Sequence, residues 1–276
     1  MDKTTHKDPK SKLRFRISSK ISKSDIKQLA YIHVEALRDD DSATVKFADK
    51  DEFRCKIQEM LEGQLIATGM SVRPEFTTSC VDQWFIIKAS LIDSSEYNES
   101  EKIIGWASWL HEGSESGTVS ATRMLVSDQG NSKENNQKLL QFNHGLGAFV
   151  RRHQTRIYAE WCSKRSEEAS EYLSLRACFI LPEFQRCGVG GALVRYGCER
   201  ADLLGLDTLV TSTQVAKSLY ESVGKFEVFE QLEVNLNDFD DKTKRHDSQG
   251  QESARNYRFW FLARIHGGWK HTAHKD

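Results

Sequence analysis

The stretch Gln185-Arg186-Cys187-Gly188-Val189-Gly190-Gly191 decides the fold of this chain. An apolar run from Tyr172 to Leu181 precedes it, and Pro182 ends that run. A helical pattern from about Gly190 to Leu204 follows, with Gly205 as its stop signal. The first N–H groups of a helix lack main-chain partners, and glycines let such groups approach a phosphate closely. The order of strand, glycine-rich turn and helix therefore predicts a phosphate-binding turn.

Two common nucleotide-binding motifs do not fit these glycines. A Walker loop requires Lys followed by Ser or Thr, and no such pair follows here. A dinucleotide fingerprint requires a third glycine, where this chain has Leu193, and an acidic residue at the end of the next strand. The nearest acidic candidate, Asp207, begins that strand instead. Both nucleotide readings are disfavoured.

The spacing resembles the pyrophosphate loop of the GCN5-related N-acetyltransferase (GNAT) family, Q/R-x-x-G-x-G/A, which Gln185, Gly188 and Gly190 match. The family's downstream Y-E-x-x-G-F element is matched by the run from Tyr220 to Phe226, with one extra residue between glycine and phenylalanine. A generic strand–turn–helix connection is the alternative. The resemblance implies an α/β fold with a mixed, mostly antiparallel sheet, a splayed central strand pair and flanking helices.

The resemblance also implies acetyl-CoA as co-substrate. In the family, the main chain of the central strand pairs with the pantetheine arm as an added strand would. Here that role falls to Phe179, Ile180 and Leu181. The implied pyrophosphate loop consists of Gln185, Arg186, Cys187, Gly188, Val189, Gly190 and Gly191. For Arg186, a contact with the phosphate and a solvated side chain both stay open. The Cys187 thiol is expected to lie too far along the cofactor to act as a nucleophile.

One catalytic residue is assigned by the resemblance, and one role stays open. Tyr220 matches the position of the family's usual general acid, and a phenol of pKa about 10 suits protonation of a thiolate. A core aromatic is the alternative for Tyr220. For the general base, the central strand offers no carboxylate in its run Ser174-Leu175-Arg176. The remaining candidates are water, Glu160, Glu171, His111 and Glu112.

Composition limits the classes of partner. The net charge of −1 gives no basic excess that would suggest nucleic acid or an anionic membrane. No apolar run approaches the ~20 residues of a membrane span. The six cysteines are scattered without a C-x-x-C pair, which favours free thiols in a reducing compartment over disulfides or a metal site. We therefore expect a cytoplasmic protein without a bound metal.

The chain order predicts one domain over residues 12–266 that includes a flexible loop, 237–255, with a disordered segment before it, 1–11, and a polar tail after it, 267–276. Strands are predicted at Leu13–Ile17, Gln83–Leu91, Lys102–Leu110, Tyr172–Leu181, Thr208–Ser212, Phe226–Leu236 and Tyr257–Ile265. Besides the helix after the glycines, helices are predicted at Ser24–Leu37, Lys50–Glu62 (ended by Gly63) and Leu139–His153, with a loop at His111–Glu134. His33 falls on an apolar helix face, where a core or cleft-wall histidine is expected.

The implied function is that of an acetyl-CoA-dependent N-acetyltransferase that acts on an amine by direct transfer in a ternary complex. A small-molecule amine is favoured as acceptor, because no peptide-binding module is recognisable. A protein amine and a hydroxyl acceptor stay open, as does the oligomeric state. The alternative is a non-catalytic acyl-CoA-binding regulatory module of the same fold. The missing strand carboxylate supports that alternative, and Tyr220 opposes it.

Overall fold

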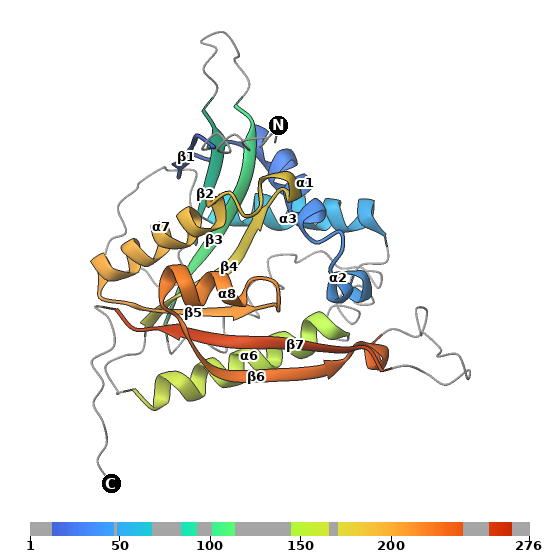
Figure 1. The fold of residues 1–276 in the computed structure, drawn as a ribbon, viewed down its shortest axis with the longest axis vertical. Coiled ribbons are helices and arrows are strands. Elements are labelled where there is room, and N and C mark those ends of the chain that lie inside the picture. The colour runs from blue at the N-terminus through green and yellow to red at the C-terminus, as the bar shows by residue number, and fades with distance from the viewer. Residues whose placement is uncertain are drawn as a thin grey trace, which may run out of the picture.

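The structure is a computed structural model that describes residues 13–46, 49–67, 84–92, 101–113, 145–165, 171–239 and 254–266. These residues form one seven-stranded sheet in the order β1-β2-β3-β4-β5-β7-β6, with helices on both faces (Figure 1). Within them, β4 and β5 run parallel and every other neighbouring strand pair is antiparallel. The predicted fold class, a mixed and mostly antiparallel α/β sheet flanked by helices, is confirmed.

The first half of the sheet follows the predicted strands. It consists of β1 (Phe15–Ser18), β2 (Trp84–Leu91), β3 (Ile103–Gly113) and β4 (Glu171–Ile180). β2 and β3 form the predicted antiparallel hairpin. The prediction of a loop from His111 onward is wrong at its start, because His111 and Glu112 belong to β3 and pair with β4, which satisfies their main-chain groups. The rest of that predicted loop lies outside the described residues.

The helices before β2 begin at a capping box. They are η1 (Lys23–Asp25), α1 (Ile26–Ala36), α2 (Asp41–Lys46) and α3 (Lys50–Ala67). The N–H of Ser22 donates to Oδ2 of Asp25 at 2.8 Å, which secures the start of η1. The prediction that Gly63 ends α3 is wrong, since the helix continues to Ala67. Gln64 is buried and continues the inward face of Leu61, and that packing outweighs the ~1 kcal/mol cost of a helical glycine.

The helix before β4 ends later than predicted. α6 (Leu146–Ser163) continues past the predicted end at His153. The extension buries Ile157, Tyr158 and Cys162 against the sheet, and this burial explains why the helix does not stop earlier. The predicted portion before Gly145 lies outside the described residues.

The second half of the chain confirms the predicted strands and the helix after the glycines. Its elements are η3 (Pro182–Phe184), α7 (Val189–Leu204), β5 (Asp207–Ser212), α8 (Lys217–Leu219), η4 (Tyr220–Gly224), β6 (Glu227–Asn235), η5 (Leu236–Phe239) and β7 (Asn256–Arg264). The loop predicted from Asn237 is wrong at its start, because Asn237 is buried within η5. Its N–H donates to Oδ1 of Asn235, as does the N–H of Arg255, and this shared acceptor ties the two ends together.

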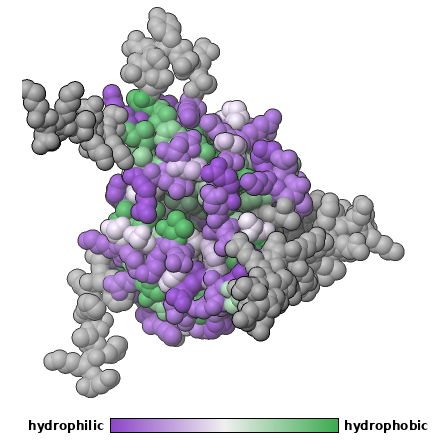
Figure 2. Space-filling model, turned by 45° about the vertical axis from the view of Figure 1, so that its right-hand side comes forward, coloured by the Kyte–Doolittle hydropathy of each residue, from purple (hydrophilic) through white to green (hydrophobic). Residues whose placement is uncertain are grey.

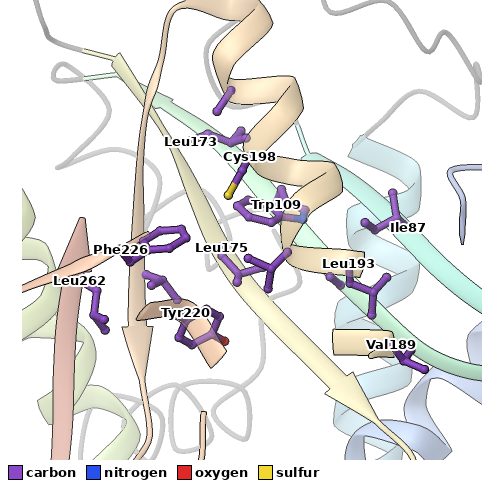
Figure 3. Packing of buried hydrophobic residues seen from close by; sticks show 14 of the residues in the cluster. Ile87, Trp109, Leu173, Leu175, Val189, Leu193, Cys198, Tyr220, Phe226 and Leu262 are labelled. Carbon is purple, nitrogen blue, oxygen red and sulfur yellow. The ribbon is translucent and has the colours of Figure 1, made fainter. Parts of the chain in front are cut away.

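The main core lies between α7 and the sheet (Figure 3). Leu193, Cys198 and Ala201 of α7 pack there with Trp109 of β3 and Leu175 of β4. A Cβ atom at Gly197 would lie 2.1 Å from the Trp109 ring, so only glycine lets α7 approach this closely. Among the described helices, none is long and apolar enough to cross a membrane.

Candidate active site

β4 and β5 pair over only part of their length. The parallel pairing runs from Tyr172 opposite Asp207 to Leu175 opposite Val210. Beyond it, β4 continues to Ile180 without a β5 partner among the described residues. We call the opening between these two strands the V. The predicted splayed central pair is therefore confirmed, and Figure 1 shows the two strands diverging.

A β-bulge explains where the V begins. In the β3–β4 ladder, Ser108 pairs with Ala177 and Trp109 with Leu175, so Arg176 is the extra residue. A bulge bends its strand and increases the local twist. Arg176 directly follows the last β4 residue that pairs with β5, so the bend falls where β4 leaves β5. Figure 2 shows the surface with the right-hand side of Figure 1 turned forward, where apolar residues lie among polar ones.

The main chain of β4 alternates between β3 and the V. The N–H of Leu181 donates to the carbonyl of Ile104 at 3.0 Å, so this group is already used. Because neighbouring residues of a strand face opposite sides, Ile180 turns its main chain toward the V, as does Cys178. The Ile180 carbonyl accepts from Nε2 of Gln185 at 3.1 Å, in agreement with this direction.

Among the three residues predicted to contact the pantetheine arm, Ile180 is therefore the one whose main chain faces the V. Phe179 instead stacks its ring on His33, with centroids 3.7 Å apart, on the face of the sheet away from α7. His33 is a buried residue of that aromatic cluster, as expected for a core histidine. Cys178 was not named from the sequence as a residue whose main chain faces the V, although it lies two residues before Ile180 and strand alternation gives it the same direction.

The glycine-rich turn lies beside the open end of the V. Arg186 and Gly188 have positive φ angles of 61° and 86°, and α7 begins directly after them. Left-handed residues in such a turn orient successive N–H groups into a concave anion site. Gln185, Arg186 and Cys187 are exposed there, so the predicted loop is accessible. A Cβ atom at Gly190 would lie 3.2 Å from side-chain atoms of Ile180 and Leu219, so glycine keeps the turn close to the V.

Tyr220 begins η4, in the segment that follows β5. It is 5% exposed and packs edge-on against Phe226, with ring centroids 5.9 Å apart. Burial raises the pKa of Tyr220 well above its ordinary value, with smaller contributions from Cys178 and Tyr158. Figure 3 shows its hydroxyl turned away from Phe226. No hydrogen bond within the described residues involves this hydroxyl, which leaves it available as a donor.

The extra residue in the Y-E-x-x-G-F element is absorbed locally. The residues Tyr220–Gly224 form a wide π-type turn, and Lys225 follows with a positive φ of 54°. The N–H of Lys225 closes the turn on the carbonyl of Tyr220. Phe226 is thereby returned to the core at 2% exposure, so the aromatic pair is kept despite the insertion.

The candidate general bases lie at different distances from the bulge. Glu171 lies at the start of β4 and contacts Nε2 of His111 at 3.0 Å. Glu160 pairs with Arg156 on the exposed side of α6. Glu112 contacts the bulge residue Arg176, with 3.5 Å between Oε1 of Glu112 and Nη1 of Arg176. Glu112 is therefore the candidate that the structure brings to the bulge.

On the face of the sheet away from α7, a hydrogen bond joins the residue before α2 to β7. The hydroxyl of Tyr257 in β7 donates to Oδ2 of Asp40 at 2.7 Å. Asp40 also caps α2, because its Oδ1 accepts from the N–H and hydroxyl of Ser42. The sequence signal Asp40-Asp41-Ser42 indicates a helix cap, but nothing in it indicates a partner in β7. We call the Asp40–Tyr257 contact the bridge.

A comparison with known proteins agrees with this geometry. The family model described as the acetyltransferase (GNAT) family matches residues 70–224. Proteins of this family use acetyl-CoA as acetyl donor. No curated protein matches the sequence.

Two solved structures share the fold. A mosquito arylalkylamine N-acetyltransferase-like protein, 5b, is 11% identical with a TM-score of 0.51, covering 91% of this chain and 99% of that one. A polyamine N-acetyltransferase from Drosophila melanogaster is 12% identical with a TM-score of 0.51, covering 91% and 100%. At such low identity, these likenesses show the fold alone.

Proposed function

The chain belongs to the GNAT acetyltransferase family, and we propose that it is an acetyl-CoA-dependent N-acetyltransferase that acts on an amine by direct transfer in a ternary complex. One observation carries the proposal. The V opens between a strand whose Ile180 main chain faces it and a short helix that supplies Tyr220, with the α7 turn at its mouth. This arrangement supports the proposal that a phosphate, an extended pantetheine arm and a proton donor come together here.

The residues present fit acetyl-CoA. The first turn of α7 offers main-chain N–H groups to a pyrophosphate, and the glycines leave those groups accessible. The Ile180 and Cys178 main chain can pair with the amides of a pantetheine arm. Acetyl-CoA supplies an activated acetyl thioester, and the chain contributes mainly by positioning it.

Tyr220 is proposed as the general acid. At neutral pH the phenol is protonated and has a proton to give, and its raised pKa extends this protonated range to higher pH. The acceptor nitrogen forms a C–N bond with the acetyl carbon while the C–S bond breaks. The departing sulfur takes the Tyr220 proton, and the surplus proton of the amine leaves to water or a carboxylate. Glu112 is the nearest described carboxylate candidate at the bulge.

The acceptor and the location are also proposals. A small-molecule amine is favoured, and a protein amine is the second candidate. The cysteines within the described residues, Cys55, Cys162, Cys178, Cys187 and Cys198, are free thiols. Free thiols support a reducing, cytoplasmic setting.

The experiment is a thiol-release assay with acetyl-CoA and a panel of amines, combined with calorimetric binding of acetyl-CoA. We expect micromolar-to-millimolar binding and release of CoA thiol that depends on the amine. Binding without release from any amine would overturn the enzyme assignment and favour the regulatory-module alternative. Absence of acetyl-CoA binding would overturn both.

A further inference from the structure

The bulge residue Arg176 occupies a special place in the proposed reaction. It follows the last β4 residue that pairs with β5, so it lies at the vertex of the V. The α7 turn is at the open end, and the arm of acetyl-CoA would run from there along Ile180 and Cys178 toward this vertex. The acetyl group would therefore end near Arg176, where the acceptor must meet it.

Arg176 faces the side of the sheet opposite α7. Its guanidinium contacts Glu112, and Glu112 pairs in register with Tyr172, whose ring packs against Tyr158 of α6. The Arg176–Glu112 distance of 3.5 Å is long for a charge-assisted hydrogen bond. Since the Arg176 side chain is 28% exposed, it keeps donors that a ligand can reach.

A second guanidinium approaches from α6. Arg151, Gln154 and Tyr158 share one helical face, since they are three and four residues apart. The Tyr158 hydroxyl lies 3.0 Å from Oγ1 of Thr211 in β5, which fixes this face of α6 beside the vertex. Desolvation and the neighbouring charge of Arg176 both lower the pKa of Arg151. Arg151 is solvent-accessible, so a ligand at the vertex can reach its guanidinium group.

Among the described residues, the vertex therefore carries the guanidinium groups of Arg176 and Arg151 and the carboxylate of Glu112. Two further acidic side chains on this side have partners elsewhere. Asp40 accepts from Tyr257 and Ser42, and Asp41 lies 3.7 Å from Arg255. A di- or polycationic acceptor would meet a positive charge excess here. A carboxylate beside the reacting amine would be attracted, and arginine binds carboxylates in a two-pronged geometry.

We propose that the acceptor is an amine that carries a carboxylate, of the amino-acid type, and that Arg176 binds this carboxylate with support from Arg151. The proposal rests on the function proposed above and names its substrate class. Arg176 thereby orients the amine toward the vertex, and Arg151 raises the local attraction for an anion. Glu112 neutralises part of the charge and holds Arg176 in place.

The experiment uses pairs of amines that differ only by the carboxylate: tryptophan and tryptamine, ornithine and putrescine, arginine and agmatine. Thiol release gives kcat/KM for each amine with wild type, Arg176→Met and Arg151→Met. We expect wild type to favour the carboxylate member by roughly 10-fold or more, as a charge-assisted bond would allow. The preference should vanish in Arg176→Met and fall in part in Arg151→Met, with the KM for acetyl-CoA unchanged. Comparing variants with wild type cancels the difference in basicity within each pair.

A matched control is Arg156→Met, on the same helix but paired with Glu160 on the exposed side. It should keep the wild-type preference. If Arg176→Met does not fold, Arg151→Met on the helix surface still tests the proposal. Equal rates within the pairs, or a preference for the decarboxylated amines, would overturn the proposal and leave the acetyltransferase assignment standing.

A binding measurement separates the two failures if no amine is acetylated. Calorimetry in the presence of CoA then compares N-acetyltryptophan with N-acetyltryptamine. Tighter binding of the carboxylate product, lost in Arg176→Met, would support the carboxylate site even without turnover. Equal binding, or binding of neither, would overturn it.

Discussion

The two faces of the V are built from different kinds of sequence. On the α7 face, the turn, the helix and Tyr220 come from one continuous stretch, and local signals specify each of them. On the opposite face, Arg176, Arg151 and the Asp40–Tyr257 bridge come from four elements far apart in the chain. The α7 face carries the motifs that resemble the family's, whereas the opposite face is held together by contacts between distant parts of the chain. Our proposal for the reaction rests on the first face, and our proposal for the acceptor rests on the second.

The largest effect is expected when the proposed proton donor on the α7 face is removed. Tyr220→Phe removes one hydroxyl from a buried ring and leaves the packing against Phe226. Turnover should fall by ~10²–10⁴-fold, the usual worth of a positioned acid, while acetyl-CoA affinity holds. Thiol release and calorimetry on both proteins measure the two effects. Unchanged turnover would make Tyr220 a core residue only.

The same residue predicts a pH dependence. Because the pKa of Tyr220 is raised, the phenol stays protonated above its ordinary range, and its loss as an acid shifts to higher pH. Near pH ~10, the kcat of wild type and that of Tyr220→Phe should therefore change with pH in the same way, because Tyr220 does not yet lose its proton there. A pH profile of both proteins checks this.

The next effect breaks the α7 face at its phosphate turn. Gly190→Asp adds a negative charge where helix N–H groups face a pyrophosphate, so acetyl-CoA affinity should fall by ~100-fold or more, about 2.7 kcal/mol. The side-chain ends of Ile180 and Leu219 lie 3.2 Å from the new Cβ and can shift, so the fold should persist. Gly63→Asp in α3, where a Cβ meets nothing within 4 Å, is the matched control for calorimetry. Equal affinities for the two variants would contradict the loop assignment.

A smaller effect, on stability, is expected when the bridge on the opposite face is removed. Tyr257→Phe removes the donor to Asp40, a bond to a charged group worth about 1.5–3 kcal/mol. Stability in urea should fall by about that amount, and acetyl-CoA affinity should not change. Tyr31→Phe, on an exposed face of α1, is the control and should leave stability unaltered. Loss of acetyl-CoA binding in Tyr257→Phe would show that the bridge acts on the α7 face as well.

The smallest effect is expected for the segment between β6 and β7. Its ends are joined, because the N–H of Leu236 donates to the carbonyl of Arg255 at 2.9 Å. Deletion of Lys242–Gly250 should therefore leave acetyl-CoA affinity within a few-fold, since closing a surface loop costs little. A large loss in calorimetry would assign this segment to the cofactor site.

The sequence predicted the turn and the helix of the α7 face, because the signals for both are local. The Gly188 and Gly205 positions with positive φ, the turn before α7 and the strand alternation each depend on neighbouring residues. It did not predict that α3 passes through Gly63, because buried side chains beyond the glycine decide that outcome.

The opposite face could not be predicted, for a different physical reason. The bulge at Arg176 depends on the register with β3, and the bridge depends on a contact between α2 and β7. The period-two pattern of a strand continues through a bulge only with a shift, which hides the side that Arg176 faces. Long-range pairing of this kind leaves no local signature in the chain.

Residue-resolved hydrogen exchange with and without acetyl-CoA tests the central claim most directly, namely that the V holds this molecule. We predict that acetyl-CoA slows exchange at the main-chain N–H of Ile180 and at the first turn of α7, Val189–Gly191. The Leu181 N–H, already bonded to Ile104, should serve as an internal reference that changes little. Protection confined to other parts of the chain, with none at Ile180 or the α7 turn, would contradict the claim.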